Sequence, residues 1–340
     1  QRQMCIRDSG MSYQQFLQTR IFDKVGMAGT RYNADHLKPG DKAAVGHAKY
    51  DFKDLRTVAP LTWSNNAGAG GIYSSAHDMA RWMQVQLAEG KLADGTPLFS
   101  EKSQQQMWRM ITPQSIPAPS VPELAPARAN FAGYGEGWSL SDYRGQKLVW
   151  HTGGWPGMVS RLTLVPGEKL GVVVLTNQEV GAAFNAITLS VLDAYLGGEK
   201  HDWVDAYAKA VAKGQDKADE AWAKHQSARD KGSRPSLALA GYTGMFRDRW
   251  YGDMQVSAEG KGLRLRFAKT AQLSGRLEHW QHDTFIVRWD DRSLNADAFV
   301  NFSLDPDGKV REVRMQSISD LTDFSFDFQD LLFTPVKLSL

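Results

Sequence analysis

The sequence predicts a layered α/β (α+β) domain that is followed by a small all-β, barrel-like domain. From residue 10 to residue 198, helix patterns are mixed with strands that a tight hairpin joins, and such elements pack as layers. From residue 199 to residue 235, Ala, Lys, Asp, Glu and Gln dominate, which is typical of a helical connector. From residue 236 to residue 340, short alternating segments are separated by turn signals, and this pattern favours a barrel-like sheet.

The first nine residues fit no helix or strand pattern, and they lack the apolar run of a secretory signal. They resemble translated adaptor sequence, so we leave them, together with Cys5, out of the fold prediction. A helix is expected over residues 12–25, capped by Ser12 and ended by Gly26 or Gly29. Because the domain starts inside this helix, we expect the chain to be a fragment.

Three more helices and three strands are expected in the first domain. Ser75 and Asp78 have the spacing of a capping box at the start of one helix. Five prolines between Pro113 and Pro126 predict a stiff, extended surface loop, which is either a lid or variable surface. Pro166-Gly167 predicts a hairpin between the last two strands. The helices are expected near residues 75–89, 100–111 and 179–196, and the strands at 147–152, 159–165 and 170–176.

The connector is expected to be helical and to end at Gly232 and Pro235. In the domain that follows, hydrophobic and polar residues alternate at 263–267 and again at 324–328, and about eight strands are expected. An aromatic-rich barrel core needs no ligand, so we assign the aromatic residues of this domain to its core. These residues are Trp280, Phe285, Trp289, Phe299 and Phe302.

Composition and charge exclude several classes of function. The 340 residues carry 40 basic and 38 acidic side chains, so a nucleic-acid partner is not expected. No segment approaches the roughly 18 apolar residues of a membrane-spanning helix. One cysteine excludes an internal disulfide, and the scattered histidines, among them His36, His47 and His77, lack the spacing of metal ligands. We therefore expect neither a metal nor a cofactor.

The segment from Trp150 to Gly157 (Trp-His-Thr-Gly-Gly-Trp-Pro-Gly) is the most informative for chemistry. A glycine pair lets a ligand approach the backbone, whose amide hydrogens can then bind it. His151 precedes the pair, and a histidine can act as acid, base or hydrogen-bond donor near neutral pH. From the residues alone, a hairpin bend with a structural histidine stays the alternative. Ser74 and Ser75 are interpreted as helix caps, because no Gly-x-Ser-x-Gly elbow surrounds them.

His151-Thr-Gly-Gly154, followed by Gly157, resembles the third motif of serine beta-lactamase-related hydrolases and penicillin-recognising enzymes. The usual form of that motif is Lys-Thr-Gly, and His-Thr-Gly is a recurring variant. Residues 16–27 resemble the family's helix with its Gly-Met ending, and residues 69–82 resemble its glycine turn and the helix that follows. Residues 237–336 resemble the small β domain that such hydrolases often carry. The resemblance implies a beta-lactamase-like sandwich of which this chain holds the C-terminal half.

The resemblance also implies a serine hydrolase that forms an acyl-enzyme on an ester, a D-amino-acid peptide or a beta-lactam-like substrate. His151 and Thr152 would belong to the catalytic motif, and the Gly154 amide would donate to the oxyanion. The implied substrate-binding residues are His151, Thr152, Gly153, Gly154 and Trp155. Trp155 either walls the substrate pocket or only covers the hairpin. Histidine in place of lysine removes a permanent positive charge, which disfavours antibiotic hydrolysis and leaves esterase, D-amino peptidase and carboxypeptidase activities open.

Two motifs of the family are absent from the sequence. No serine is followed three residues later by lysine, and no tyrosine is followed two residues later by asparagine. Ser141-Asp-Tyr143 departs from the Ser-Asp-Asn form at its third position. The nucleophile and its base are therefore absent from this chain, and we expect it to be an inactive, N-terminally truncated fragment. Residues 10–198 alone should aggregate through an unpaired sheet edge, whereas residues 236–340 should fold independently.

The alternative to a hydrolase is a non-catalytic binding or assembly module built on the same fold. As a hydrolase, the protein is expected to take a small molecule or a peptide as its partner. Its expected location is periplasmic or secreted, because members of the family are commonly exported. The oligomeric state and the role of the β domain are left open by the sequence.

Overall fold

A computed structural model of the chain describes residues 7–62 and 68–336. By their packing these residues divide into two compact units. Unit 1 comprises the residues up to Ala48 and Leu55–Val211, and unit 2 comprises Lys49–Asp54 and the residues from Ala212 onward. The division near residue 211 falls inside one long helix, α7 (Trp203–Ala228), between the boundaries that the sequence predicted at residues 198 and 236.

The first helical segments of unit 1 follow one another without a break. Ser12 caps α2 (Tyr13–Leu17) as predicted, and its hydroxyl accepts a hydrogen bond from the Gln15 amide at 3.2 Å. A π-helical turn, η1 (Gln18–Phe22), and α3 (Asp23–Val25) continue the helix, which ends at Gly26 with a φ of +77°. Residues 7–9 are also helical, although the sequence pattern predicted no element there.

Unit 1 contains a six-stranded antiparallel sheet in which each strand pairs with its neighbour in the chain. The sequence predicted only the last three strands. The first three were missed because two of them are two or three residues long and contain proline or glycine, and the third is mostly polar. The strands are β3 (Thr112–Pro113), β4 (Ala132–Tyr134), β5 (Ser139–Tyr143), β6 (Gln146–Trp155), β7 (Met158–Val165) and β8 (Leu170–Thr176).

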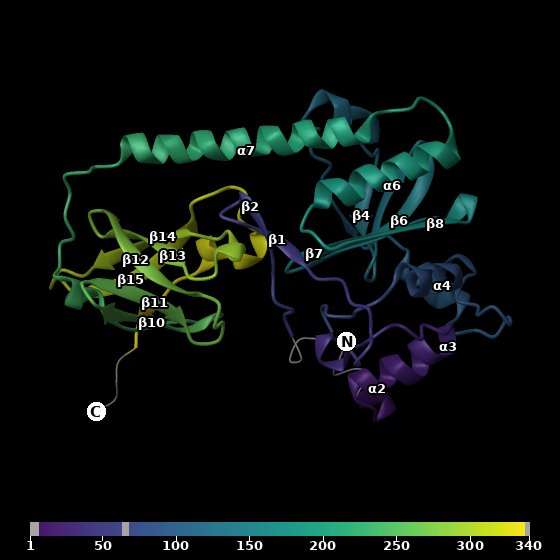
Figure 1. Cartoon of the computed structure of the whole chain (residues 1–340), viewed down its shortest axis with the longest axis horizontal. Helices are drawn as coiled ribbons and strands as arrows, with labels where there is room; N and C mark the ends of the chain where they lie inside the picture. The colour runs from purple at the N-terminus through teal and green to yellow at the C-terminus, as the bar shows by residue number, and fades with distance from the viewer. Residues whose placement is uncertain (1–6, 63–67, 337–340) are drawn as a thin grey trace. The chain divides into compact units, whose positions relative to one another are not determined.

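Helices cover both faces of this sheet (Figure 1). On one face lies α6 (Gly181–Leu196), whose Phe184 shares a buried cluster with Leu148 of β6. On the other face lies α4 (Ala76–Leu87), whose Met83 shares a second cluster with Val149. Successive residues of a strand point to opposite faces, so β6 supplies both clusters. These helices and α5 (Glu101–Met107) confirm the three that were predicted after residue 70.

The capping box at α4 is only half formed. The Ser75 hydroxyl accepts a hydrogen bond from the Asp78 amide at 3.2 Å, which is the predicted cap. The buried Asp78 carboxylate, however, accepts from the Gly29 amide at 2.9 Å and from the Thr30 hydroxyl at 2.8 Å. Asp78 therefore fixes the loop after α3 to α4, a role that its spacing from Ser75 does not indicate.

The sequence predicted that the proline-rich segment is extended, but only part of it is. Pro113 ends β3, and residues Pro122–Ala127 form a 3-10 helix, η3, with a proline at its start. Proline fits there because the first residues of a helix have no partner for an amide hydrogen. The other short 3-10 helices are η2 (Ala34–His36), η4 (Pro166–Glu168), η5 (Leu239–Tyr242), η6 (Arg292–Leu294), η7 (Phe324–Phe326) and η8 (Phe328–Asp330).

Strand β8 forms one edge of the sheet. In the described part of the chain it pairs only with β7, and Leu175 on it is 43% exposed. An edge strand with an exposed apolar side chain is a site of strand pairing between chains. The aggregation of residues 10–198 alone stays a prediction, and β8 is the strand through which we expect it to occur.

Unit 2 contains an eight-stranded antiparallel sheet in the order β15-β14-β13-β12-β11-β10-β9-β16. Val313 of β15 also bridges to Phe333, just before β16, so the sheet is nearly closed into a barrel. The barrel-like sheet agrees with the predicted fold, but the alternating segment 324–328 was wrongly predicted as a strand: it forms the 3-10 helices η7 and η8. The strands are β9 (Gly244–Asp248), β10 (Gly252–Glu259), β11 (Gly262–Phe267), β12 (Ser274–Gln281), β13 (Thr284–Trp289), β14 (Ala298–Leu304), β15 (Val310–Ser317) and β16 (Thr334–Pro335).

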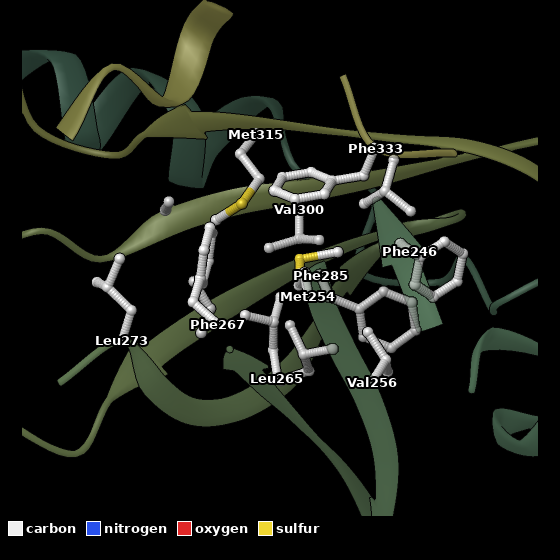
Figure 2. Close-up of a cluster of buried hydrophobic side chains, with 14 of the residues drawn as sticks. Phe246, Met254, Val256, Leu265, Phe267, Leu273, Phe285, Val300, Met315 and Phe333 are labelled. Atoms are coloured by element: carbon white, nitrogen blue, oxygen red, sulfur yellow. The ribbon is translucent and has the colours of Figure 1, made fainter. Parts of the chain in front are cut away.

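The interior of this barrel is filled by apolar side chains (Figure 2). Phe285, Trp289 and Phe302 are each at most 2% exposed and belong to one cluster, as predicted. Trp280 and Phe299 instead pack with Trp222 of α7, at ring-centroid distances of 5.3 and 6.4 Å from Trp222. The C-terminal half of α7 is thus part of the packing of unit 2.

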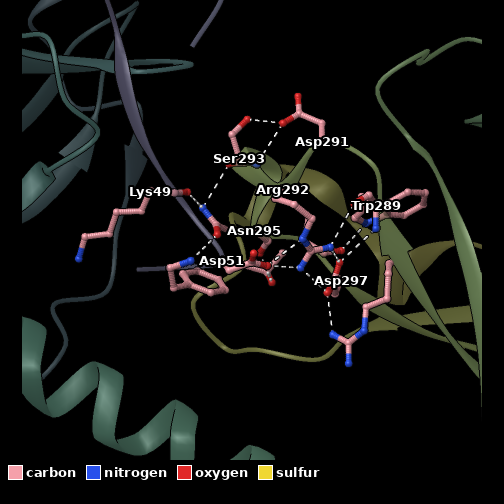
Figure 3. Close-up of polar contacts among 12 residues, drawn as sticks. Lys49, Asp51, Trp289, Asp291, Arg292, Ser293, Asn295 and Asp297 are labelled. Atoms are coloured by element: carbon pink, nitrogen blue, oxygen red, sulfur yellow. Dashed lines mark hydrogen bonds and ion pairs between the residues drawn. The ribbon is translucent and has the colours of Figure 1, made fainter. Parts of the chain in front are cut away.

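Residues 49–54 form the tip of a hairpin between β1 (His47–Tyr50) and β2 (Asp54–Thr57), and this tip packs in unit 2 (Figure 3). The side chain of Asn295 holds it from two sides. Its Nδ2 donates to the Lys49 carbonyl at 2.7 Å, and its Oδ1 accepts from the Phe52 amide at 2.7 Å. The contact joins residues more than 240 positions apart, so no local pattern predicts it.

An arginine between two carboxylates supports the same tip. Arg292 Nε donates to Asp51 Oδ1 at 2.8 Å, and its Nη1 donates to Asp297 Oδ1 at 2.6 Å. Burial acts to raise the pKa of the Asp297 carboxyl, but hydrogen bonds from Arg292 and Arg288 outweigh burial and lower it. The charged form of Asp297 is therefore favoured in the folded protein.

Candidate functional site

The third-motif residues all lie within strand β6. The sequence predicted that this strand ends at Thr152, but it continues to Trp155, and the turn is made by Pro156 and Gly157. His151 pairs with Leu162 of β7, and Gly154 pairs with Val159. The glycines therefore serve as strand residues with no side chain, and they are not the bend that was considered as the alternative.

One side of this part of β6 has no strand partner. Strand β5 pairs with β6 only as far as Trp150, while β7 pairs with it through Trp155. In the described residues, no strand pairs with positions 151–155 on the side away from β7. Backbone groups along such an edge are available to an extended ligand.

The imidazole of His151 is exposed and has two uncharged partners. Its Nδ1 lies 2.6 Å from the carbonyl oxygen of Thr152, and its Nε2 lies 3.0 Å from the hydroxyl of Tyr134. The Tyr134 ring meets the imidazole edge to face, with ring centroids 5.9 Å apart. A hydrogen-bonded histidine was thus expected, but its partner Tyr134 was not.

Gly153 and Gly154 differ in the free space around the position that a Cβ atom would occupy. A side chain at Gly153 would meet the hydroxyl of Ser160, 2.7 Å from the position of its Cβ, whereas Gly154 is exposed with no atom within 4 Å of that position. Gly154 is thus the more accessible of the two glycine positions.

Thr152 lies opposite Arg161 in the register of β6 and β7. The Arg161 guanidinium stacks on the Trp150 ring at 4.3 Å and donates to the Asn185 amide oxygen at 2.7 Å. Burial lowers the pKa of Arg161 to about 10. Arg161 thus links β7 to Trp150 of β6 and to Asn185 of α6, and both of these partners are uncharged.

The indole of Trp155 packs against the glycine turn that precedes α4. A Cβ atom at Gly70 or Gly71 would lie 3.7 Å from the indole ring, which is ordinary van der Waals contact, so the ring lies directly against this turn. Tyr73, two residues further, has its pKa raised by burial, which a hydrogen bond with Trp155 partly offsets. Trp155 therefore joins the site strand to a segment more than 80 residues earlier in the chain.

A small apolar cavity of about 170 Å³ adjoins the hairpin tip beyond Trp155. Pro156 and Met158 line it from the tip, and Tyr73 lines it from the segment before α4. Val58 and the segment 43–46 form much of its remaining wall. The cavity is large enough for a small apolar group.

Sequence reasoning missed Tyr134, Ser160 and the cavity wall. Tyr134 stands between two glycines, and Ser160 stands in an otherwise ordinary strand. The flanking glycines were the one local signal, since glycine in a strand indicates a close approach of other atoms.

In the described residues, no three histidine, cysteine, aspartate or glutamate side chains gather as a metal site would need. No helix among the described residues is both long and apolar enough to span a membrane.

Two family models match the chain. The model described as Beta-lactamase matches residues 5–195, and the model described as Domain of unknown function (DUF3471) matches residues 228–335. The first match covers more than half of the 340 residues, and the fold agrees with it. The chain belongs to the beta-lactamase family.

Similar curated proteins are hydrolases and penicillin-binding proteins by name. Unguisins hydrolase ungD of Aspergillus violaceofuscus is 25% identical over 328 residues, which are 90% of this chain and 57% of that protein. Penicillin-binding protein 4* of Bacillus subtilis is 27% identical over 207 residues, 57% of this chain and 41% of that one. D-alanyl-D-alanine-carboxypeptidase/endopeptidase AmpH of Escherichia coli is 24% identical, over 56% of this chain and 47% of that one. The chain thus spans about half the length of these relatives.

Among solved structures, the octameric penicillin-binding protein homologue from Pyrococcus abyssi is similar with a TM-score of 0.47 and 18% identity. The match covers 96% of this chain and 61% of that one.

Proposed function

We propose that the whole protein is a serine hydrolase that acts through an acyl-enzyme on an ester, a D-amino-acid peptide or a beta-lactam-like substrate. The observation that carries this proposal is the edge of β6 at positions 151–155, which pairs with no further strand in the described part of the chain and where Gly154 leaves the backbone open to a ligand. The membership of the family and the hydrolase names of its relatives support the reaction class.

In the proposed reaction, a serine hydroxyl attacks the substrate carbonyl carbon, and the bond to the leaving group breaks. The serine proton passes through a base to the leaving group, and water later releases the acyl group. The Gly154 amide would donate to the oxyanion in both steps, while His151, Thr152 and Gly153 would position the substrate along the edge. Trp155 would wall the same site against the glycine turn at Gly70 and Gly71.

The serine and its base are proposed to lie outside these 340 residues, because neither Ser-x-x-Lys nor Tyr-x-Asn occurs in them. By itself, the chain is therefore proposed to be inactive. The proposed location, periplasmic or secreted, rests on the resemblance to exported members of the family.

A serine-directed fluorophosphonate tests this proposal. The 340-residue chain should remain unlabelled, and the whole protein, expressed from the genomic reading frame, should be labelled at one serine within a Ser-x-x-Lys motif. Labelling of the shorter chain at a single serine would contradict its inactivity. If the whole protein stayed unlabelled while folded, the serine-hydrolase proposal would be wrong, and a binding or assembly module would take its place.

A further inference from the structure

The hydrogen bonds around His151 fix where the proton of its neutral ring lies. A carbonyl oxygen only accepts hydrogen bonds, so Nδ1, which lies 2.6 Å from the Thr152 carbonyl oxygen, must carry the hydrogen. In the neutral ring Nε2 is then an acceptor. The Tyr134 hydroxyl, 3.0 Å away, must therefore donate to it.

This arrangement uses every donor of the pair. The Nδ1 hydrogen goes to Thr152, and the Tyr134 hydroxyl hydrogen goes to His151. The two lone pairs of the phenol oxygen remain, and they can only accept a hydrogen bond. A lysine at position 151, as in the usual form of the motif, would instead offer three donors and a positive charge.

We propose that Tyr134 is a positioning residue that holds His151 in the Nδ1-protonated form, and that the pair selects substrates with an N–H or O–H donor at this point. A carboxylate placed there would face lone pairs, whereas an amide N–H could donate to the phenol oxygen. The substrate class is then a carboxamide or an internal peptide bond, and not a peptide with a free carboxylate beside the scissile bond. This choice of substrate rests on the proposed function; the proton position does not.

The proton position is tested on the 340-residue chain, so no catalytic activity is needed. In ¹⁵N-histidine spectra at about pH 8.5, above the ordinary titration range of histidine, His151 should show a protonated Nδ1 and a hydrogen-bonded, unprotonated Nε2. His151→Gln assigns the signals. Tyr134→Phe should shift the Nε2 signal and let the Nε2-protonated form appear. The matched control is Tyr195→Phe, because Tyr195 is 71% exposed on α6, and it should leave the His151 signals unchanged.

A His151 ring that is protonated at Nε2 in the unsubstituted chain would overturn the proposal. So would a Tyr134→Phe spectrum identical to that of the unsubstituted chain.

Ligand selection is tested with N-acetyl-D-alaninamide and N-acetyl-D-alanine, which differ only in the amide and the carboxylate. The amide should bind the chain at least about tenfold more tightly, measured by isothermal titration calorimetry, which applies to every variant. Tyr134→Phe should reduce this preference, and His151→Lys should reverse it. Equal or tighter binding of the carboxylate, or no binding of the amide, would overturn the selection.

In the whole protein, the same selection should appear as a lower KM for a D-alanyl peptide carboxamide than for the free acid. A whole protein that cleaves neither peptide would argue against the proposed hydrolase, while the ring spectra and the binding preference would still decide the inference.

Discussion

At the tip of the β6–β7 hairpin, Gly157 has a φ of +78°, a conformation that residues with a side chain rarely adopt. A Cβ at this position would also lie 2.4 Å from the Val58 side chain and 2.7 Å from the His47 amide nitrogen. The Gly157 carbonyl accepts from that same amide at 3.0 Å, and its own amide donates to Glu179 at 2.8 Å. Glycine at this residue therefore brings the site hairpin against the segment at His47.

We expect Gly157→Ala to lower the stability of unit 1 by roughly 2–4 kcal/mol, because strain and backbone collision act together. Gly154→Ala is the matched control: it lies in the same hairpin, its φ is not positive and its Cβ would meet nothing within 4 Å. Its stability should stay within about 0.5 kcal/mol of the unsubstituted chain. Urea unfolding of the two variants measures this, and equal midpoints would show that the close packing at Gly157 is not essential.

Among the elements, the β1–β2 hairpin shows how a short segment depends on distant side chains. Its tip in unit 2 is held through Asn295, which has a φ of +48° and two hydrogen bonds from its side chain to the tip. Asparagine suits both tasks, because it tolerates the left-handed conformation and carries a donor and an acceptor.

Asn295→Gly should therefore release the tip without straining the backbone. Loss of the acceptor for the Phe52 amide, worth about 1–2 kcal/mol, should speed hydrogen exchange of that amide roughly 5–30-fold. Asn295→Asp serves for comparison, because an aspartate keeps an acceptor for the Phe52 amide but loses the donor to the Lys49 and Ser293 carbonyl oxygens. A Phe52 amide that exchanges as slowly in Asn295→Gly as in the unsubstituted chain would mean that the side chain of residue 295 does not hold the tip.

On the scale of the whole molecule, α7 contributes residues to both units. Unit 2 therefore includes a helical segment that precedes its first strand, β9. Trp222 of this helix covers Trp280, and Arg229 lies 4.5 Å from the Trp280 ring and donates to its carbonyl at 2.7 Å. Independent folding of residues 236–340 was expected from the strand pattern alone. That fragment lacks both Trp222 and Arg229, which pack against Trp280.

We expect residues 212–340 to be about 2 kcal/mol more stable than residues 236–340, because the shorter fragment exposes Trp280 and Phe299 to water. Trp222→Ala in the complete chain should remove most of the same increment from unit 2. Val211→Ala should have no measurable effect, since Val211 is 52% exposed on the same helix. Urea unfolding followed by tryptophan fluorescence measures both comparisons. Equal stability of the two fragments would mean that α7 does not contribute to the stability of unit 2.

The sequence by itself determined the elements with a strong local period. The helices at 75–89 and 179–196, the strands from β6 to β8 and the barrel-like class of unit 2 follow from spacing and turn residues, because the hydrophobic periods of helices and strands are local. Alternation alone was misleading at 324–328, where the chain forms 3-10 helices. The third motif identified the family, and a motif is also a local pattern.

Only the tertiary structure decided which side chains meet. Tyr134 of β4 contacts His151 of β6, although β5 lies between these strands in the sheet. Trp155 packs on a glycine turn more than 80 residues earlier, and Asn295 holds residues near position 50. The short, glycine-containing β4 and the mostly polar β5 also escaped prediction, because their pairing, and not their own pattern, stabilises them. The composition of a site depends on contacts between distant residues, and periodicity along the chain carries no record of those contacts.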